Sequence, residues 1–160
     1  VPVDPAELSP GAFVSQIREQ VERDDVRVVV IDSLNGYFNS MPEERFMVVH
    51  MHELLAYLAL RGVTALLISP QHGLIGQMDS VFDVSYLADC VMLLRYFEVH
   101  AEVRQAISVL KKRTGRHERT IRPMHFDADG IHIGEPLRAF HGVLTGVPQL
   151  QATGEGGHAP

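Results

Sequence analysis

The stretch VRVVVIDS at residues 26–33 decides the fold class. Only Arg27 interrupts its run of β-branched apolar residues, and such a run is typical of a parallel-sheet strand that is covered on both faces. Residues 63–68, VTALLI, predict a second buried strand of this kind. Between the two, residues 41–61 predict a long helix that ends at Gly62. Strand, helix and strand in this order indicate a parallel α/β sheet.

The flanking segments extend this pattern on both sides. Ser9 and Pro10 have the character of an N-cap and a first helical position, and they predict a helix to about Arg23. On the C-terminal side the alternating segments predict two antiparallel strand pairs, residues 90–97 with 104–113 and residues 120–126 with 130–133. The turn of the second pair is the segment DADG at residues 127–130. The expected fold is therefore a parallel sheet flanked by helices, with an antiparallel hairpin extension.

The connecting segments carry turn and loop signals. Asn35 and Gly36 predict a turn after the first strand, and residues 71–80 form a Gly-rich loop. Residues 81–87 are ambiguous, with a short helix as one option. From residue 149 onward the sequence is Gly-rich and polar. We therefore expect one domain at residues 1–148 and a flexible tail at residues 149–160.

Composition narrows the class of protein. The chain has 160 residues, of which 46% are apolar and 21% charged, as expected of one globular domain with a sizeable core. No apolar run has the length of a membrane span, so no membrane association is expected. The sequence starts without Met and without a signal-peptide pattern, so we expect a fragment or a processed product. The single cysteine, Cys90, cannot form an internal disulfide, which favours a cytoplasmic location.

Charge is distributed unevenly along the chain. The net charge is −6, yet between Lys111 and Arg122 there are six basic residues and one acid. A local cationic patch on an acidic protein suggests a discrete anion site. Nucleic-acid binding is the weaker interpretation, because no aromatic residues for base stacking are interleaved with these cations.

Two polar residues follow the predicted parallel strands at their carboxyl ends, where ligands of open α/β sheets bind. Asp32 ends the first strand, and an Asp there can help to hold Mg²⁺, usually through water. The plain alternative is a turn-forming Asp. Gln71 follows the second strand and could sense a γ-phosphate or orient water, with a solvated loop residue as the alternative.

The tripeptide Lys111-Lys112-Arg113 ends a predicted strand. In a strand, Lys111 and Arg113 project from one face and Lys112 from the other. Two adjacent cations make a phosphate clamp, to which Arg adds a bidentate fork. The alternative is a solvated edge strand whose lysines discourage aggregation.

Metal and hydrolase sites have little support in the sequence. The nine histidines are scattered, and His50 and His52 lie two apart on a helix, so they cannot readily share a metal ion. No HExxH or CxxC segment is present, so a zinc site is not expected. Ser33 and Ser85 have no evident His partner for a catalytic triad.

Four segments, taken together and in order, resemble the KaiC branch of the RecA-like ATPases. They are VVVIDSL at residues 28–34, VSYLADCVMLLRYFE at 84–98, AISVLKKRTGRHERTIR at 106–122 and GEPLRAFHGVLTGVP at 134–148. The third and fourth are highly specific. The resemblance implies a RecA-like fold and an ATP-dependent role in a signalling or circadian-clock-type regulatory protein.

The resemblance also implies roles for individual residues. Asp32 matches the Walker B acid, which contacts Mg²⁺, with Ser33 beside it in the nucleotide site. Lys111 and Arg113 match the Lys-x-Arg element that reaches the γ-phosphate of ATP bound by a neighbouring subunit of a ring. His117 and Arg119 match further residues near that interface, and Gln71 would sense the γ-phosphate. Some members autophosphorylate on an adjacent Ser–Thr pair; here Ser85 is followed by Tyr86, which puts autokinase activity in doubt.

One family element is absent from the sequence. No G-x-x-x-x-G-K-[ST] loop occurs, and in the family this loop and its strand precede the part matched here. The expected fold is thus a RecA-like sheet that is incomplete because the P-loop strand is missing, and ATP and Mg²⁺ are expected in a full-length parent but not on the isolated chain. The fragment could associate as a dimer or by strand swapping. A second hypothesis is a non-catalytic oligomerisation module derived from the same fold.

Overall fold

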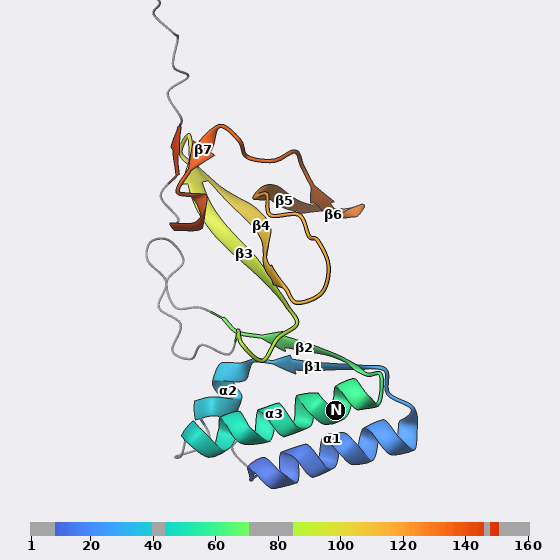
Figure 1. Cartoon of the computed structure of the whole chain (residues 1–160). Helices are drawn as coiled ribbons and strands as arrows, with labels where there is room; N and C mark the ends of the chain where they lie inside the picture. The colour runs from blue at the N-terminus through green and yellow to red at the C-terminus, as the bar shows by residue number, and fades with distance from the viewer. Residues whose placement is uncertain (1–8, 40–43, 71–84, 146–147, 151–160) are drawn as a thin grey trace, which may run out of the picture. The chain divides into compact units, whose positions relative to one another are not determined.

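We describe a computed structural model of the chain for residues 9–39, 44–70, 85–145 and 148–150. It has two units, Val1–Pro70 and Gln71–Pro160, and each has its own sheet (Figure 1). Within the described residues, no helix is long and apolar enough to cross a membrane.

The first unit places two helices on a small parallel sheet. Strands β1 (Val28–Asp32) and β2 (Thr64–Ile68) pair in parallel, with Val28 opposite Thr64 and Asp32 opposite Ile68. Helices α1 (Pro10–Asp24) and α3 (Glu44–Leu60) run side by side along one face of this sheet (Figure 1). The helix–strand–helix–strand order predicted from the sequence is confirmed.

Local signals explain where the two long helices begin and end. Ser9 caps α1, because its Oγ accepts a hydrogen bond of 3.2 Å from the Ala12 N–H, and Pro10 occupies the first position. Gly62 ends α3 with φ +68°, a conformation that favours glycine. The Val63 N–H then bonds back to the Leu58 carbonyl at 2.9 Å, which satisfies a carbonyl of the last turn.

The core of this unit lies between the helices and the sheet. Met51, Leu54 and Leu58 of α3 are fully buried, and Val14 and Val21 of α1 are largely buried. These positions follow the helical period, so each helix turns one apolar stripe inward.

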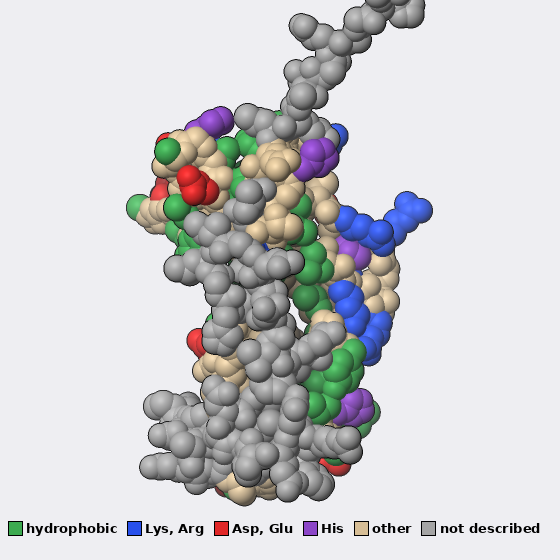
Figure 2. Space-filling model, turned by 90° about the vertical axis from the view of Figure 1, so that its left-hand side faces the viewer, with side chains coloured by type: hydrophobic (Ala, Val, Ile, Leu, Met, Phe, Trp, Pro, Cys, Tyr) green, Lys and Arg blue, Asp and Glu red, His purple; other side chains and the backbone are tan. Residues whose placement is uncertain are grey.

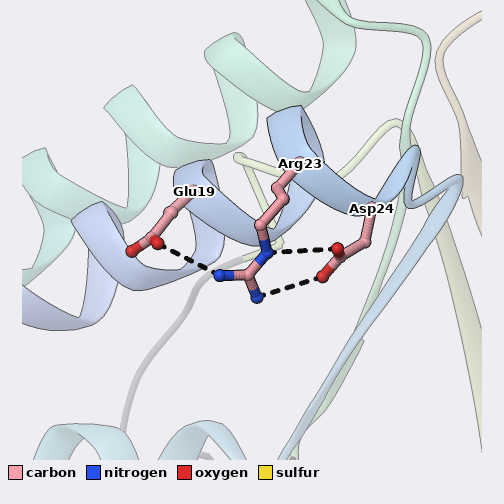
Figure 3. A network of polar contacts seen from close by, with 3 residues as sticks. All are labelled: Glu19, Arg23 and Asp24. Carbon is pink, nitrogen blue, oxygen red and sulfur yellow. Dashed lines mark hydrogen bonds and ion pairs between the residues drawn. The ribbon is translucent and has the colours of Figure 1, made fainter.

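Polar side chains on the surface of the first unit link α1 to α3, and others pair with one another in the last turns of α1. Glu22 of α1 accepts hydrogen bonds from Tyr57 and Arg61 at 3.0 and 2.7 Å. Near the end of α1, Arg23 bridges Glu19 and Asp24 (Figure 3). The hydrogen bond to Asp24 holds the pKa of Arg23 above its usual value, but such exposed pairs contribute little to stability.

Two expectations for this unit were wrong. The strands are covered on one face only: Val28, Val30 and Leu66 are about half exposed, whereas Ile31 is buried. Among the described residues, the helices pack on one side of the sheet, and the apolar side chains on the other side stay about half exposed. The turn predicted around Asn35 and Gly36 is instead a short helix, α2 (Leu34–Asn39), which begins as the Gly36 N–H bonds to the Ser33 carbonyl at 3.1 Å.

Other boundaries agree or fall outside the described residues. The long helix predicted over residues 41–61 is α3, and residues 41–43 are not described. Of the ambiguous segment at residues 81–87, the described part, 85–87, is a turn.

The second unit is an antiparallel sheet in the order β3-β4-β5-β6. Its strands are β3 (Cys90–Val99), β4 (Glu102–Lys112), β5 (Arg122–Asp127) and β6 (Gly130–Ile133). The two hairpins predicted from the sequence are confirmed, with turns at His100–Ala101 and Ala128–Asp129. Among the described residues, β2 pairs with β1 and not with β3, so the parallel and antiparallel sheets are separate.

The remaining elements close the second core. A short pair, β7 (Phe140–His141) and β8 (Gln149–Leu150), flanks the 3₁₀ turn η1 (Val143–Thr145). Phe97, Val99, Ala106 and Val143 form the buried cluster, and Ile121, Leu137 and Phe140 pack against it. Thus Gln149 and Leu150, expected in the tail, form a strand, while residues 151–160 lie outside the described part.

Candidate functional site

Asp32 lies at the carboxyl end of β1, with its side chain exposed. The following peptide, Asp32–Ser33, is cis, and Ser33 is half-buried. Beside it, Asn35 Nδ2 donates a 3.0 Å hydrogen bond to the carbonyl of Pro70, just after β2. This bond links the segments that follow the two parallel strands. The Asp32 carboxylate lies at the same edge of the sheet, which is where α/β sheets bind ligands.

Lys111 and Arg113 converge on one short segment of the second unit. Lys111 Nζ donates to the carbonyl of Ser85 at 2.9 Å, and Arg113 Nη2 donates to that of Tyr86 at 3.2 Å. Arg113 Nη1 also pairs with Asp89 Oδ1 at 3.0 Å, and the Arg113 N–H bonds to the Asp89 carbonyl at 2.7 Å. The two cations therefore bond to neighbouring carbonyls, although β4 ends at Lys112, so Arg113 lies just beyond the strand and not on one of its faces.

An irregularity in the pairing of β3 with β4 lies just before these cations. Met92 is opposite Val109 but Val91 is opposite Lys111, so β4 carries one extra residue, Leu110. Such a β-bulge changes the direction of the strand and redirects the side chains beyond it. Beyond the bulge, Lys111 is half-buried and Lys112 is exposed.

A polar network holds the loop that carries the other cations. Glu118 Oε1 accepts hydrogen bonds from Thr120 and from Arg122 Nε, and Arg122 Nη1 donates to the Gly134 carbonyl at 2.9 Å. The bond from Thr120, with those from Arg122, holds the pKa of Glu118 below its usual value. The loop from β4 to β5 is thereby anchored to the residue after β6.

His117 and Arg119 lie in this anchored loop. His117 is half-buried, and within the described residues its Nε2 is buried without a hydrogen-bond partner. Arg119 is exposed. Figure 2 shows Lys and Arg side chains, in blue, gathered along one side of the face in view.

The predicted site residues divide between the two units. Asp32 and Ser33 belong to the first unit. The second unit holds the predicted cations and histidine, which are Lys111, Arg113, His117 and Arg119. Gln71 lies outside the described residues.

Sequence inspection missed one grouping of polar side chains. On the β5–β6 hairpin, Asp127 Oδ1 lies 2.9 Å from His132 Nε2, and Asp127 Oδ2 lies 3.9 Å from His125 Nε2. A hydrogen bond from the Asp129 N–H, with the two imidazoles, holds the pKa of Asp127 below its usual value. This grouping could have been predicted from the register of the hairpin. A two-residue turn between Asp127 and Gly130 places His125 opposite His132.

Comparison with known proteins supplies the family. A family model described as "ATPase: KaiC" matches residues 4–138, which is most of the chain. Circadian clock protein KaiC3 of Synechocystis is 42% identical over 72 residues, 45% of this chain and 14% of that protein. Circadian clock oscillator protein KaiC of Thermostichus vulcanus is 34% identical over 65 residues, 41% of this chain and 12% of that protein. The matched segments thus span only a small part of these relatives.

A solved structure shares the fold. The KaiC-like protein PH0186 of Pyrococcus horikoshii superposes with a TM-score of 0.66 at 23% identity, over 79% of this chain and 55% of that one. The sequence match and the shared architecture agree with the four segments that suggested the resemblance. The chain therefore belongs to the KaiC family of RecA-type ATPases.

Proposed function

We propose that this chain forms part of a KaiC-like ATPase domain in a cytoplasmic signalling or circadian-clock-type regulatory protein. In this proposal Lys111 and Arg113 contact the γ-phosphate of ATP bound by a neighbouring subunit of a ring. One observation carries it: the two side chains lie together at the end of β4, anchored on the carbonyls of Ser85 and Tyr86. Paired cations that are already oriented lose little entropy on meeting a phosphate.

The free energies involved allow Arg113 to change partners. Its ion pair with Asp89 is exposed, with 56% and 75% of the two side chains accessible, and such pairs contribute about 0–1 kcal/mol. An arginine that acts in trans on a transferring phosphoryl group accelerates the reaction by about 10³–10⁵-fold, or about 4–7 kcal/mol. The contact with Asp89 therefore positions Arg113 without competing seriously with a phosphate.

Asp32 and Ser33 are proposed for the other side of the nucleotide. An exposed carboxylate at the carboxyl end of a parallel strand suits an indirect contact with Mg²⁺, through a water molecule. In this proposal ATP and Mg²⁺ are bound where a phosphate-cradling loop is also present, and no such loop occurs in this sequence. His117 and Arg119, in the anchored loop, would line the same interface as Arg113, and Gln71 would sense the γ-phosphate.

Self-association is part of the proposal. Val28 and Val30 of β1 and Leu66 and Ile68 of β2 lie on the same face of the sheet and are 43–54% exposed. A contiguous apolar face of this kind favours contact with another apolar surface. A partner segment of the same protein or of another subunit would bury it.

Complementation within mixed rings tests the trans role of Arg113. In a natural full-length protein that contains this chain, Arg113→Ala should lower ATPase activity by about 10³-fold or more, and Lys112→Ala much less. Subunits with Arg113→Ala and subunits with a disabled phosphate loop should each be inactive alone. Mixed rings will contain some interfaces with both parts intact and should regain activity. Mixed rings confirmed by mass analysis that stay inactive would refute the trans role.

The non-catalytic alternative also has an observation in its favour. Lys111 and Arg113 already bond within their own unit, so they could serve only to shape the turn at residues 85–87. In that case the full-length protein would show no ATPase activity, and Arg113→Ala would change only its assembly. Light scattering on the same variants separates the two functions.

A further inference from the structure

The β5–β6 hairpin brings two histidines and an aspartate to one face. His125 and His132 are directly opposite in the antiparallel register, and their rings stack with centroids 4.9 Å apart and planes at 14°. Asp127 lies two residues after His125 on the same strand, so its side chain points to the same side. Three potential ligands therefore share one surface without any long-range contact.

The spacing of their ligand atoms suits one small cation. Taking one ligand atom from each residue, all three lie within 4.8 Å of one another. His132 Nε2 lies 2.9 Å from Asp127 Oδ1, and His125 Nε2 lies 3.9 Å from Asp127 Oδ2. Zinc binds imidazole nitrogen and carboxylate oxygen at about 2.0–2.2 Å in a tetrahedron, which places neighbouring ligand atoms about 3.3 Å apart. The His132 distance is shorter than this value and the His125 distance is longer. Because the two imidazole planes are stacked at 14°, one ring would have to turn about its side-chain bonds for both nitrogens to face one ion.

We propose that His125, Asp127 and His132 bind a divalent transition-metal ion of the zinc class. Two imidazoles with one carboxylate favour Zn²⁺, Co²⁺ or Ni²⁺ over Mg²⁺ and Ca²⁺, which prefer oxygen ligands alone. The site is distinct from the proposed nucleotide contacts, in which Asp32 reaches Mg²⁺ through water.

A backbone hydrogen bond orients the Asp127 carboxylate. The Asp129 N–H donates to Asp127 Oδ1 at 2.8 Å, which fixes the carboxylate beside the imidazoles. Such outer contacts strengthen metal sites by holding ligands in their binding orientation. His125 and Asp127 are exposed and His132 is half-buried, so an ion bound by these three would keep an open position for water or for a ligand from another molecule.

Calorimetric titration of the purified chain with Zn²⁺ tests the proposal. One equivalent should bind, and the ring signals of His125 and His132 should shift in ¹H–¹⁵N spectra. Loss of an outer-shell partner lowers metal affinity by about 10–100-fold, so loss of a ligand should lower it at least as much. His125→Gln, His132→Gln and Asp127→Asn are the test variants. His52→Gln, an exposed histidine on α3, is the matched control and should leave the affinity unchanged.

Two results would overturn the site. One is an absence of stoichiometric Zn²⁺ binding to the folded chain. The other is binding that survives both His125→Gln and His132→Gln, because the ion would then be held elsewhere. Circular dichroism of each variant excludes unfolding as the cause of lost binding, and a Mg²⁺ titration should give no comparable heat.

Discussion

Phe97 should dominate the stability of the unit that carries the proposed phosphate contacts. Its side chain is fully buried against Val99, Ala106 and Val143, so Phe97→Ala removes the largest member of that cluster. Substitutions of this kind destabilise proteins by about 3–5 kcal/mol, which combines lost burial with the cavity left behind. Phe126 of β5 is the matched control, because it is 59% exposed in the same unit. Fully burying such a side chain contributes about 1.5–3 kcal/mol to the free energy of unfolding. Because only about two-fifths of Phe126 is buried, Phe126→Ala should cost about 0.6–1.2 kcal/mol.

Urea unfolding followed by the amide signals of β3 and β4 measures both variants. With a denaturant slope of about 2 kcal/mol per molar, the midpoint should fall by about 1.5–2.5 M for Phe97→Ala and by about 0.3–0.6 M for Phe126→Ala. If the first variant does not fold, Phe97→Leu should still lower the unfolding free energy by about 1–2 kcal/mol. Equal shifts at the two phenylalanines would refute the assignment of the core.

Two further predictions concern local structure. Because its hydrogen bonds lower the folded-state pKa of Glu118, the carboxylate stabilises the fold above its unfolded pKa of about 4.3, and this contribution is lost as pH falls through the folded value. Glu118→Gln should therefore lower the urea midpoint at neutral pH, and its deficit from the wild type should shrink as the pH falls through the folded pKa of Glu118; a deficit that is independent of pH would contradict this. Ser9→Ala removes the cap of α1 and should cost about 1 kcal/mol in thermal unfolding, whereas Ser15→Ala, exposed within the same helix, should be neutral or slightly stabilising.

Local chemistry accounts for the elements that the sequence predicted correctly. Ser9 with Pro10 begins α1, and Gly62 ends α3, because caps and left-handed residues act within one turn of a helix. The DADG turn likewise determines the β5–β6 hairpin. The adjacency of His125 and His132 follows from that turn by counting, so it was predictable although the sequence analysis missed it.

The wrong expectations have a different physical origin. The runs at residues 26–31 and 63–68 looked buried on both faces because they are apolar, but burial depends on what packs against each face. In the part of the chain that the structure describes, α1 and α3 pack on one side of β1 and β2, and the apolar side chains on the other side are 43–54% exposed. The apolar composition of a strand shows that burying both of its faces would be favourable. Which faces are buried depends on the elements that pack against them in the tertiary structure.

The site illustrates the same division. From the sequence alone came the family, the order of helices and strands, and the choice of Lys111 and Arg113, since these rest on short motifs and on alternation along one strand. Tertiary structure decided that both cations anchor on the turn at residues 85–87, with Asp89 beside Arg113, and that a bulge at Leu110 sets their register. A bulge is a mismatch between two paired strands, and an ion pair joins residues far apart in the chain. Neither is encoded in a single segment, so both emerge only when the segments pack.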